Sequence, residues 1–336
     1  MRLRRVTLTT GGTSVAVWDA PRERWVPLAA AAPLAGGAPP ELQAVADDPI
    51  ALLADPGLRA EAERLAAEVA DHDLDTAFSL SPALLPFAPR SLRAFAGWQE
   101  HWEQAARTLV GRYFPRVRPV MRAYERVTRT TFPPLRPGPL FFERPCFYVG
   151  THTTFLPDGA ELPWPAFCRD LDYELELACV LAHPVRDCTP DEGAAAIGGF
   201  VVMNDCSARD VQWEEARRGL FGPLGKTKSF ANAMGPELVS ADEILPRVGA
   251  LRGTVRVNGE TWSETSTAGM QHTFGELVAE AARGEQLLPG EMLSSGTLPR
   301  GCGMELDRWI QPGDALELEI EGVGVLRGTV GARGAG

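Results

Sequence analysis

An unusual row of acidic residues lies in a stretch that otherwise has the character of a buried strand. Residues 171–182 alternate acidic and apolar side chains and then become wholly apolar. In an extended chain alternate side chains share a face, so Asp172, Glu174 and Glu176 lie side by side. Ionised carboxylates at this spacing repel one another and are costly to bury unless a cation compensates them. The row suggests a site for a hard metal ion, although an edge strand with a solvated acidic face is the simpler account of this stretch taken alone.

A second apolar run ends abruptly in polar side chains. Residues 197–203 have the composition of a buried strand. The polar residues that follow are Asn204, Asp205, Arg209, Asp210 and Gln212. Functional sites are commonly built at such points, because the strand fixes the side chains while the following loop leaves access. A capped strand end without chemistry is the alternative interpretation.

Lysine is almost absent from the basic residues of this chain. The sequence has 33 lysine and arginine residues, of which only Lys226 and Lys228 are lysines. An ammonium group is a compact point charge, whereas the guanidinium of arginine is a planar fork. A position that keeps lysine in so arginine-rich a chain therefore suggests a need for the compact ammonium.

The composition of the whole chain limits its partners and its setting. The 336 residues are enough for a full core and two unequal domains, and the net charge is −11. This charge argues against nucleic acid or an anionic membrane surface as the main partner. No apolar run approaches the roughly 18 residues of a membrane span, and residues 1–5 are not followed by the apolar segment of a secretion signal. We therefore expect a cytoplasmic protein.

The cysteines show no paired spacing of the C-x-x-C kind. They are Cys146, Cys168, Cys179, Cys188, Cys206 and Cys302. Most of them lie among apolar residues, as small core side chains do. We expect reduced thiols that fill the core, rather than disulfides, a zinc site or a catalytic thiol.

The chain has three regions that differ in their hydrophobic pattern. Residues 1–89 combine strand-like alternation near the start with a helical period over residues 48–70, which indicates a small N-terminal α+β domain. Residues 90–144 form a helix and a lid or linker segment, in which Ser91 is expected to cap a helix that carries Glu100 and His101. A lone histidine on a helix is ordinarily a surface or packing residue.

The third region, residues 145–332, is rich in strand signals and is expected to be the catalytic domain. Asn258 and Gly259 lie between two alternating runs, which predicts a tight hairpin. A helix is expected over residues 274–283 and a strand over residues 315–320.

Several short motifs of this region occur together in one order. They are residues 172–177 (DYELEL), 203–212 (MNDCSARDVQ), 228–231 (KSFA), 295–297 (SGT), 312–314 (PGD) and 322–326 (GVGVL). In this order and spacing the chain resembles the fumarylacetoacetate hydrolase family over about residues 90–330. The resemblance implies an α+β, mainly β fold, in which a catalytic domain of mixed sheets forms a β-sandwich roll beside a smaller N-terminal domain.

By this resemblance Glu174, Glu176 and Asp205 bind Mg²⁺, or Mn²⁺ or Ca²⁺ in its place. The chemistry of the residues agrees, because three carboxylates suit a hard divalent cation and leave positions for water and a bidentate oxo acid. Such a metal polarises a carbonyl and stabilises the enolate that leaves when a C–C bond breaks. The resemblance also places Lys228 beside the metal, near the developing negative charge.

The remaining site residues follow from the resemblance in the same way. Arg209, Gln212, Tyr148 and Thr297 match positions that contact the substrate. His101 matches the general base of the hydrolases, and Glu305 matches the glutamate that orients it. A carboxylate that fixes the tautomer of a histidine and supports its imidazolium form is sound chemistry for activating water.

The chain departs from the family pattern in three places. Ala94, seven residues before His101, stands where the hydrolases have a fourth metal ligand, an aspartate. Ala216, four residues after Gln212, stands where the fumarylacetoacetate enzymes have a tyrosine. The segment between His101 and Pro145 is longer than usual, which suggests a reshaped lid over the pocket.

These features together predict a metal-dependent hydrolase that cleaves a C–C bond in a 1,3-diketo or 2-oxo acid. The alternatives are a 2-oxo acid decarboxylase or a tautomerase or hydratase on the same scaffold, and, outside enzymes, a metal-binding pseudoenzyme. The expected partner is a small oxo-acid substrate, and the resemblance alone suggests a homodimer.

Overall fold

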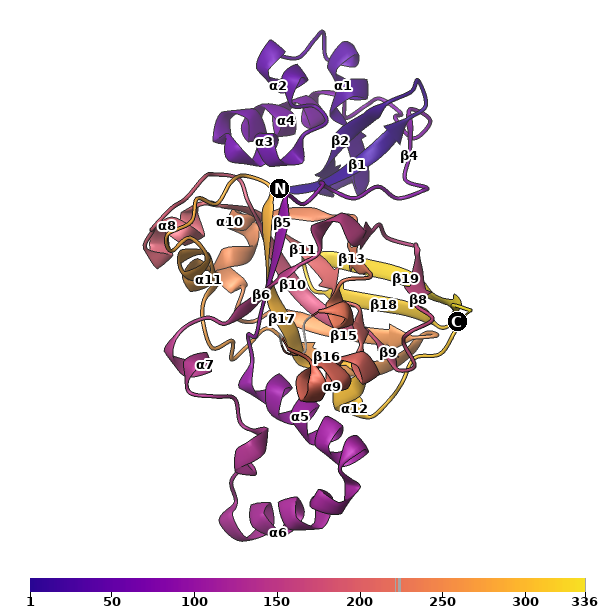
Figure 1. The fold of residues 1–336 in the computed structure, drawn as a ribbon. Helices are drawn as coiled ribbons and strands as arrows, with labels where there is room; N and C mark the ends of the chain where they lie inside the picture. Colours follow the sequence, from indigo (N-terminus) through magenta and orange to yellow (C-terminus); the bar gives the residue numbers. More distant parts are fainter. Residues whose placement is uncertain (221, 223–224, 336) are drawn as a thin grey trace.

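The computed structural model describes residues 1–220, 222 and 225–335 (Figure 1). Its largest sheet runs in the order β3-β2-β1-β14-β11-β10-β17-β5-β6. In that order the strands span Arg24–Pro27, Thr13–Asp19, Arg2–Leu8, Leu238–Ser240, Ile197–Asn204, Glu174–Leu181, Glu291–Cys302, Ser91–Phe95 and Phe147–Gly150. The short strands β4 (Phe78–Ser79), β7 (Phe155–Leu156) and β13 (Asn232–Met234) pair off this path.

Strand β10 lies at the centre of this sheet, between antiparallel β11 and antiparallel β17. All eight of its residues are buried. Leu175 and the alternate residues after it pack in the core shared with the second sheet, whereas Ala178 and Val180 pack in the core under the N-terminal helices. Glu174 and Glu176 share the face of Ala178 and Val180, because side chains alternate along a strand. The acidic row therefore lies inside the protein, and the solvated edge strand is ruled out.

The second sheet has the order β16-β15-β18-β19-β8 and packs against β10 through one hydrophobic core. Its strands span Glu260–Ser266, Arg252–Val257, Ala315–Ile320, Gly324–Arg333 and Glu161–Trp164. Asn258 and Gly259 join β15 to β16 with φ of 52° and 78°, which confirms the predicted hairpin. A two-residue pair, β9 (Leu171–Asp172) with β12 (Ser207–Ala208), lies beside the acidic row. The mixed sheets and their helices confirm the predicted α+β fold.

The N-terminal strands extend the main sheet, because β1 pairs with β14. Four helices gather at this end of the molecule, in indigo and purple at the top of Figure 1. They are α1 (Leu28–Leu34), α2 (Pro40–Ala44), α3 (Pro49–Ala54) and α4 (Pro56–Glu68). The single helix predicted over residues 48–70 is wrong in one respect, because Pro56 starts a new helix there. Asp48 and Asp55 each accept hydrogen bonds from the first free N–H groups of their helices.

The helix that carries His101 begins later than the sequence predicts. The prediction that Ser91 caps it is wrong, because residues 91–95 form strand β5 and helix α5 spans Gln99–Tyr113. Strand β5 pairs in parallel with β17, Ser91 lying opposite Glu291, and antiparallel with β6. Residues 91–95 are extended because they pair with a strand 200 residues later in the sequence. Local secondary-structure propensity does not reveal such a distant partner.

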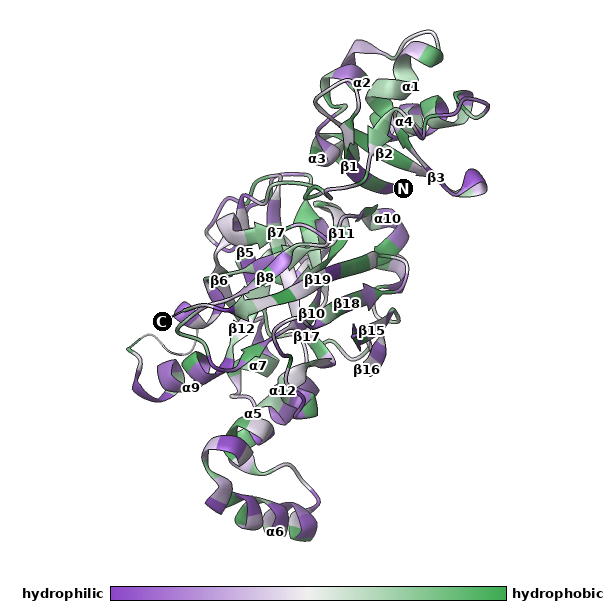
Figure 2. Cartoon of the chain, turned by 90° about the vertical axis from the view of Figure 1, so that its right-hand side faces the viewer, coloured by the Kyte–Doolittle hydropathy of each residue, from purple (hydrophilic) through white to green (hydrophobic). Residues whose placement is uncertain are grey.

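Two helices of the expected lid segment extend away from the sheets. Figures 1 and 2 show α5 and α6 (Arg118–Thr128) at the end opposite the N-terminal strands, and hydrophilic residues cover much of α6. The other helices are α7 (Leu140–Glu143), α8 (Pro190–Ala195), α9 (Arg209–Arg218), α10 (Ala241–Ile244), α11 (Phe274–Ala281) and α12 (Gly303–Leu306). Within the described residues, none of the helices has the length and apolar character needed to cross a membrane.

Replacing Gly296 by alanine is expected to destabilise the protein strongly. Gly296 has a φ of +82°, and a Cβ there would lie 2.1 Å from the carbonyl oxygen of Phe95. Gly313 has a similar φ of +89°, but a Cβ there meets nothing within 4 Å. Positive φ costs about 1–2 kcal/mol in either alanine variant. Only Gly296→Ala adds the collision, so we expect its loss of unfolding free energy to exceed that of Gly313→Ala by about 2 kcal/mol or more.

Urea unfolding followed by tryptophan fluorescence measures both variants of this pair. Equal losses of unfolding free energy would contradict the close approach of β5 to β17 at Gly296.

Candidate active site

Three buried carboxylates meet where β10 and β11 run side by side. Glu174 and Glu176 project from β10, and Asp205 follows the last residue of β11. Leu175 pairs with Asn204, and the amide of Asp205 donates to the carbonyl of Glu174 at 3.2 Å. One ligand oxygen from each carboxylate lies within 4.8 Å of the others. The structure therefore brings the three predicted metal ligands together, and we call them the carboxylate triad.

Two buried cations hold one side of the carboxylate triad. The ammonium of Lys228 donates to Glu174 and, at 2.8 Å, to Oδ2 of Asp205. The guanidinium of Arg209 donates from Nη2 to Oε1 of Glu174 at 2.6 Å. Burial alone would raise the pKa of Glu174, because it disfavours the ionised form. The positive charges of Lys228 and Arg209 outweigh the effect of burial and lower the pKa of this carboxyl. Glu174 is therefore held ionised.

Hydroxyl groups contact the other two members of the carboxylate triad. Tyr148 donates to Oδ2 of Asp205 at 2.5 Å. Thr297 lies 3.3 Å from Oε1 of Glu176, and Ser294 donates to its Oε2. Burial, with the neighbouring carboxylates, raises the pKa of Glu176 well above its usual range. A proton or a metal ion at Glu176 would relieve this repulsion.

The charges of the site leave a deficit that fits a divalent cation. Four buried carboxylates, Asp172, Glu174, Glu176 and Asp205, surround two buried cations, Arg209 and Lys228. With all groups ionised, four negative and two positive charges leave two negative charges. Oδ1 of Asp205 is buried and accepts no hydrogen bond from any described residue. The residues present therefore fit a hard divalent metal ion, which Glu174, Glu176 and Asp205 would hold.

Asp172, on the same face as the acidic pair, positions Arg209. Its carboxylate accepts from Nε of Arg209 at 2.8 Å and from the amides of Tyr173, Gly303 and Met304 at 3.0, 2.9 and 3.1 Å. The acidic row singles out Asp172 in the sequence, but nothing in the sequence indicates that it holds Arg209. Ser294 was also missed, because a serine in an apolar strand has no distinctive spacing.

Arg209 is wholly buried, and its side chain is engaged in three directions. Besides Asp172 and Glu174, it donates from Nη1 to Oε1 of Gln212 at 3.0 Å. Arg209 and Gln212 both lie in α9, three residues apart and therefore on one face. The guanidinium thus joins the carboxylate triad to Gln212, which is only half-buried.

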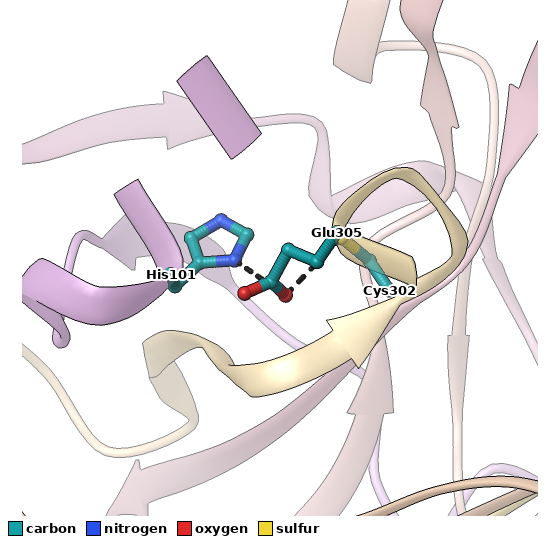
Figure 3. Close-up of side chains that lie close together, drawn as sticks. All are labelled: His101, Cys302 and Glu305. Carbon is teal, nitrogen blue, oxygen red and sulfur yellow. Dashed lines mark hydrogen bonds and ion pairs between the residues drawn. The ribbon is translucent and has the colours of Figure 1, made fainter. Parts of the chain in front are cut away.

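His101 and Glu305 form a second pair close by. Nδ1 of His101, on α5, lies 2.9 Å from Oε2 of Glu305, on α12 (Figure 3). The contact has the distance of an ion pair but not the alignment of a hydrogen bond. The Glu305 side chain is fully buried and also accepts from the amide of Arg300 at 2.9 Å. The imidazole therefore turns Nδ1 towards the carboxylate, while its Nε2 has no hydrogen-bond partner among the residues that the structure describes.

Strand pairing places this pair beside the carboxylate triad. Cys302, which ends β17, lies opposite Glu174 of β10, and α12 follows at once. Ala94, where the family pattern has a fourth ligand, lies on β5 opposite both Ser294 and Tyr148. The hydroxyl of Ser294 contacts Glu176, and the hydroxyl of Tyr148 contacts Asp205.

Comparison with known proteins matches this chain to one family. Residues 121–331 match the model described as fumarylacetoacetate (FAA) hydrolase C-terminal. An uncharacterised protein of Methanocaldococcus jannaschii is 35% identical over 168 residues, which cover 49% of this chain and 64% of that protein. A mitochondrial oxaloacetate tautomerase of Rattus norvegicus is 29% identical over 184 residues, which cover 54% of this chain and 79% of that protein.

Solved structures share the fold over most or all of the chain. A fumarylacetoacetate hydrolase from Exiguobacterium antarcticum has a TM-score of 0.63 and 22% identity, covering 99% of this chain and 100% of that one. A fumarylpyruvate hydrolase from Pseudomonas aeruginosa, in complex with Mn²⁺ and pyruvate, has a TM-score of 0.54 and 20% identity, covering 75% of this chain and 99% of that one. The match to the family model, which spans more than half of the chain, shows that this protein belongs to the fumarylacetoacetate hydrolase family.

Proposed function

We propose that this protein is a metal-dependent hydrolase that cleaves a C–C bond in a 1,3-diketo or 2-oxo acid of the acylpyruvate kind. The observation that carries the proposal is the His101–Glu305 contact of 2.9 Å beside the carboxylate triad. Fold similarity to a fumarylpyruvate hydrolase bound to Mn²⁺ and pyruvate supports the substrate class by analogy.

Glu174, Glu176 and Asp205 would hold the metal, which we propose to be Mg²⁺, with Mn²⁺ or Ca²⁺ as the alternatives. A divalent cation bound there supplies a Lewis acid for a carbonyl oxygen of the substrate. The ammonium of Lys228 forms ion pairs with two of these carboxylates, Glu174 and, at 2.8 Å, Asp205. The ammonium thereby keeps Asp205 in a fixed orientation and adds to the positive field that negative charge on the substrate meets.

His101 would act as the general base through its free Nε2. Nε2 takes a proton from a water molecule, while Glu305 holds the ring and stabilises the imidazolium that forms. The water oxygen bonds to the distal ketone carbon, and the bond from that carbon to the neighbouring CH₂ breaks. Its electron pair passes to the 2-oxo acid as an enolate, whose carbon takes back the proton held by the imidazolium of His101. The products are a carboxylic acid and a 2-oxo acid, so atoms and charge balance.

Three further residues are proposed to contact the substrate. Gln212 accepts from Arg209 through Oε1 and so can offer its amide N–H groups to a carboxylate. Tyr148 and Thr297 already contact Asp205 and Glu176, which places their hydroxyls next to any group bound at the carboxylate triad. Arg209 would act by holding Gln212 and Glu174, since its own nitrogens are engaged.

Tautomerisation or decarboxylation of oxaloacetate is the second candidate function. It is favoured by the mitochondrial oxaloacetate tautomerase of Rattus norvegicus, which is 29% identical over 54% of this chain. Such a reaction uses the same metal and enolate chemistry without attack by water, and so would not need the His101 base.

We also propose that the protein is a homodimer. Light scattering of the protein as it elutes from a size-exclusion column would measure its mass.

Replacing Glu176 is the cleanest test of the metal site. Glu174 pairs with two buried cations, so its loss would leave them uncompensated, whereas the described contacts of Glu176 are to hydroxyls. We expect Glu176→Gln to weaken Mn²⁺ binding at least about tenfold, measured by calorimetry. The control is Glu317→Gln, a half-buried carboxylate in β18 whose partner Arg327 is exposed, and it should bind Mn²⁺ normally. Unchanged affinity in a folded Glu176→Gln variant would contradict the assignment.

Replacing His101 separates the two candidate reactions. We expect His101→Ala to lower kcat for an acylpyruvate by about 10²- to 10⁴-fold, because the general base is lost. Tautomerisation and decarboxylation of oxaloacetate should be spared. The control is His183→Ala, which changes an exposed histidine. Equal loss of all activities would rule out the role of His101 in activating water.

A wider assay tests whether the protein is an enzyme at all. We expect turnover of at least one member of a panel of 1,3-diketo and 2-oxo acids when Mg²⁺ or Mn²⁺ is present. Metal binding that depends on Glu176, without turnover of any of these acids, would favour the pseudoenzyme.

A further inference from the structure

The thiol of Cys302 lies against the His101–Glu305 pair. Its Sγ donates to Oε2 of Glu305 at 3.4 Å, and the same oxygen lies 2.9 Å from Nδ1 of His101. Figure 3 shows the carboxylate lying between the imidazole and the thiol. A nitrogen of His101, the sulfur and a carboxylate oxygen lie within 4.8 Å of one another. The proposed hydrolysis uses the histidine and the glutamate but leaves the thiol without a role.

Two members of this cluster are fully buried, and the side chain of the third, His101, is 18% exposed. Cys302 is 0% exposed and the side chain of Glu305 is likewise fully buried. Across residues 1–220, 222 and 225–335, neither lysine nor arginine forms an ion pair with Glu305. Nδ1 of His101 is a buried nitrogen without an aligned hydrogen bond. A buried carboxylate next to an unpartnered nitrogen is the situation that a bound cation resolves.

We propose that His101, Cys302 and Glu305 form a binding site for a thiophilic divalent cation of the Zn²⁺ kind, separate from the carboxylate triad. Zinc binds imidazole nitrogen, thiolate sulfur and carboxylate oxygen, and three protein ligands with one open position are typical of its accessible sites. At tetrahedral angles such ligand atoms lie about 3.5 Å apart. Atoms already within 4.8 Å of one another need only draw closer.

The two sites differ in the metals that they favour. The carboxylate triad offers only oxygen, which suits Mg²⁺, Ca²⁺ and Mn²⁺. The second site adds nitrogen and sulfur, which suit zinc and cobalt. Because Cys302 pairs with Glu174 across β17 and β10, the sites lie on neighbouring strands. These two strands would thus bind hard and soft ions at adjacent positions.

A catalytic nucleophile is the other use to which such a thiol could be put, and its surroundings oppose it. Burial, and then the charge of Glu305, raise the pKa of Cys302 well above its usual range. A thiol that keeps its proton is a poor nucleophile. A metal ion overcomes this by displacing the proton, so the S–H bond breaks, a sulfur–metal bond forms and the proton leaves to solvent.

Occupation of this site has a consequence for activity that rests on the proposed function. With zinc on Nδ1, which faces Glu305, the neutral imidazole carries its proton on Nε2, so the proposed base cannot take a proton from water. Zinc would therefore block hydrolysis while the carboxylate triad keeps its own ion. The binding itself does not depend on that reaction, so the two can be tested apart.

Cobalt binding followed by absorbance tests the site directly. Reduced, chelator-treated protein is titrated with Co²⁺, which gives an intense near-ultraviolet charge-transfer band only when a thiolate is a ligand. We expect this band to rise as one equivalent of Co²⁺ binds, with a second equivalent bound without it at the carboxylate triad. Absence of the band at saturating Co²⁺ would overturn the proposal.

Two variants and a control identify the ligands. Cys302→Ser should lose the band yet still bind Co²⁺ at the carboxylate triad, which also shows that the variant is folded. Cys179→Ser, which removes another buried thiol from the adjoining strand β10, should keep the band. His101→Ala should weaken the binding that gives the band at least about tenfold. A band that survives in Cys302→Ser, or unchanged affinity in His101→Ala, would contradict the assignment.

Discussion

Ion pairing by Lys228 and Arg209 is the constraint on which the rest of the site depends. Carboxylates at alternate positions of a central strand would otherwise destabilise it strongly, since leaving one buried charge unpaired costs about 3–5 kcal/mol. Lys228 spans Glu174 and Asp205, and so ties the end of β11 to β10. Arg209 spans Asp172 and Glu174, and so ties α9 to the same strand. The two cations stabilise the fold and organise the site with the same contacts.

Lys228 and Arg209 do not compensate all of the negative charge of the carboxylate triad, and the charge that remains lies on one side of it. Glu176 has hydroxyl partners and Asp205 keeps one oxygen free, while Glu174 is paired at both oxygens. The residual negative charge therefore lies towards β17 and β6, where Ser294, Thr297 and Tyr148 gather. A metal held there would complete the charge balance of the core and would couple metal binding to the stability of the central sheet.

Much of the site could be predicted from the sequence, because its chemistry is concentrated in short runs. The alternating acids at 172, 174 and 176 and the polar end of the strand at 204–212 identified the region, and the family resemblance selected among the residues. The sequence could not show that Asp172 serves Arg209, since their contact depends on how α9 folds back. Nor could it place Ser91 in a strand, because the partner strand lies 200 residues later. The proximity of Cys302 to His101 likewise arises only when α5 and α12 meet.

The pairing of β1 with β14 has a consequence for how the protein reaches this structure. One edge of β1 pairs with the neighbouring β2, but at the other edge Leu3 pairs with Leu238, which is synthesised much later. Strand β5 likewise pairs with a strand that is synthesised much later, β17, whose Ser294 and Thr297 contact Glu176. Contacts this distant in sequence slow folding, and during synthesis they leave unpaired strand edges exposed. The order of strands thus leaves one edge of the N-terminal hairpin in need of protection from aggregation until residues 238–240 have emerged.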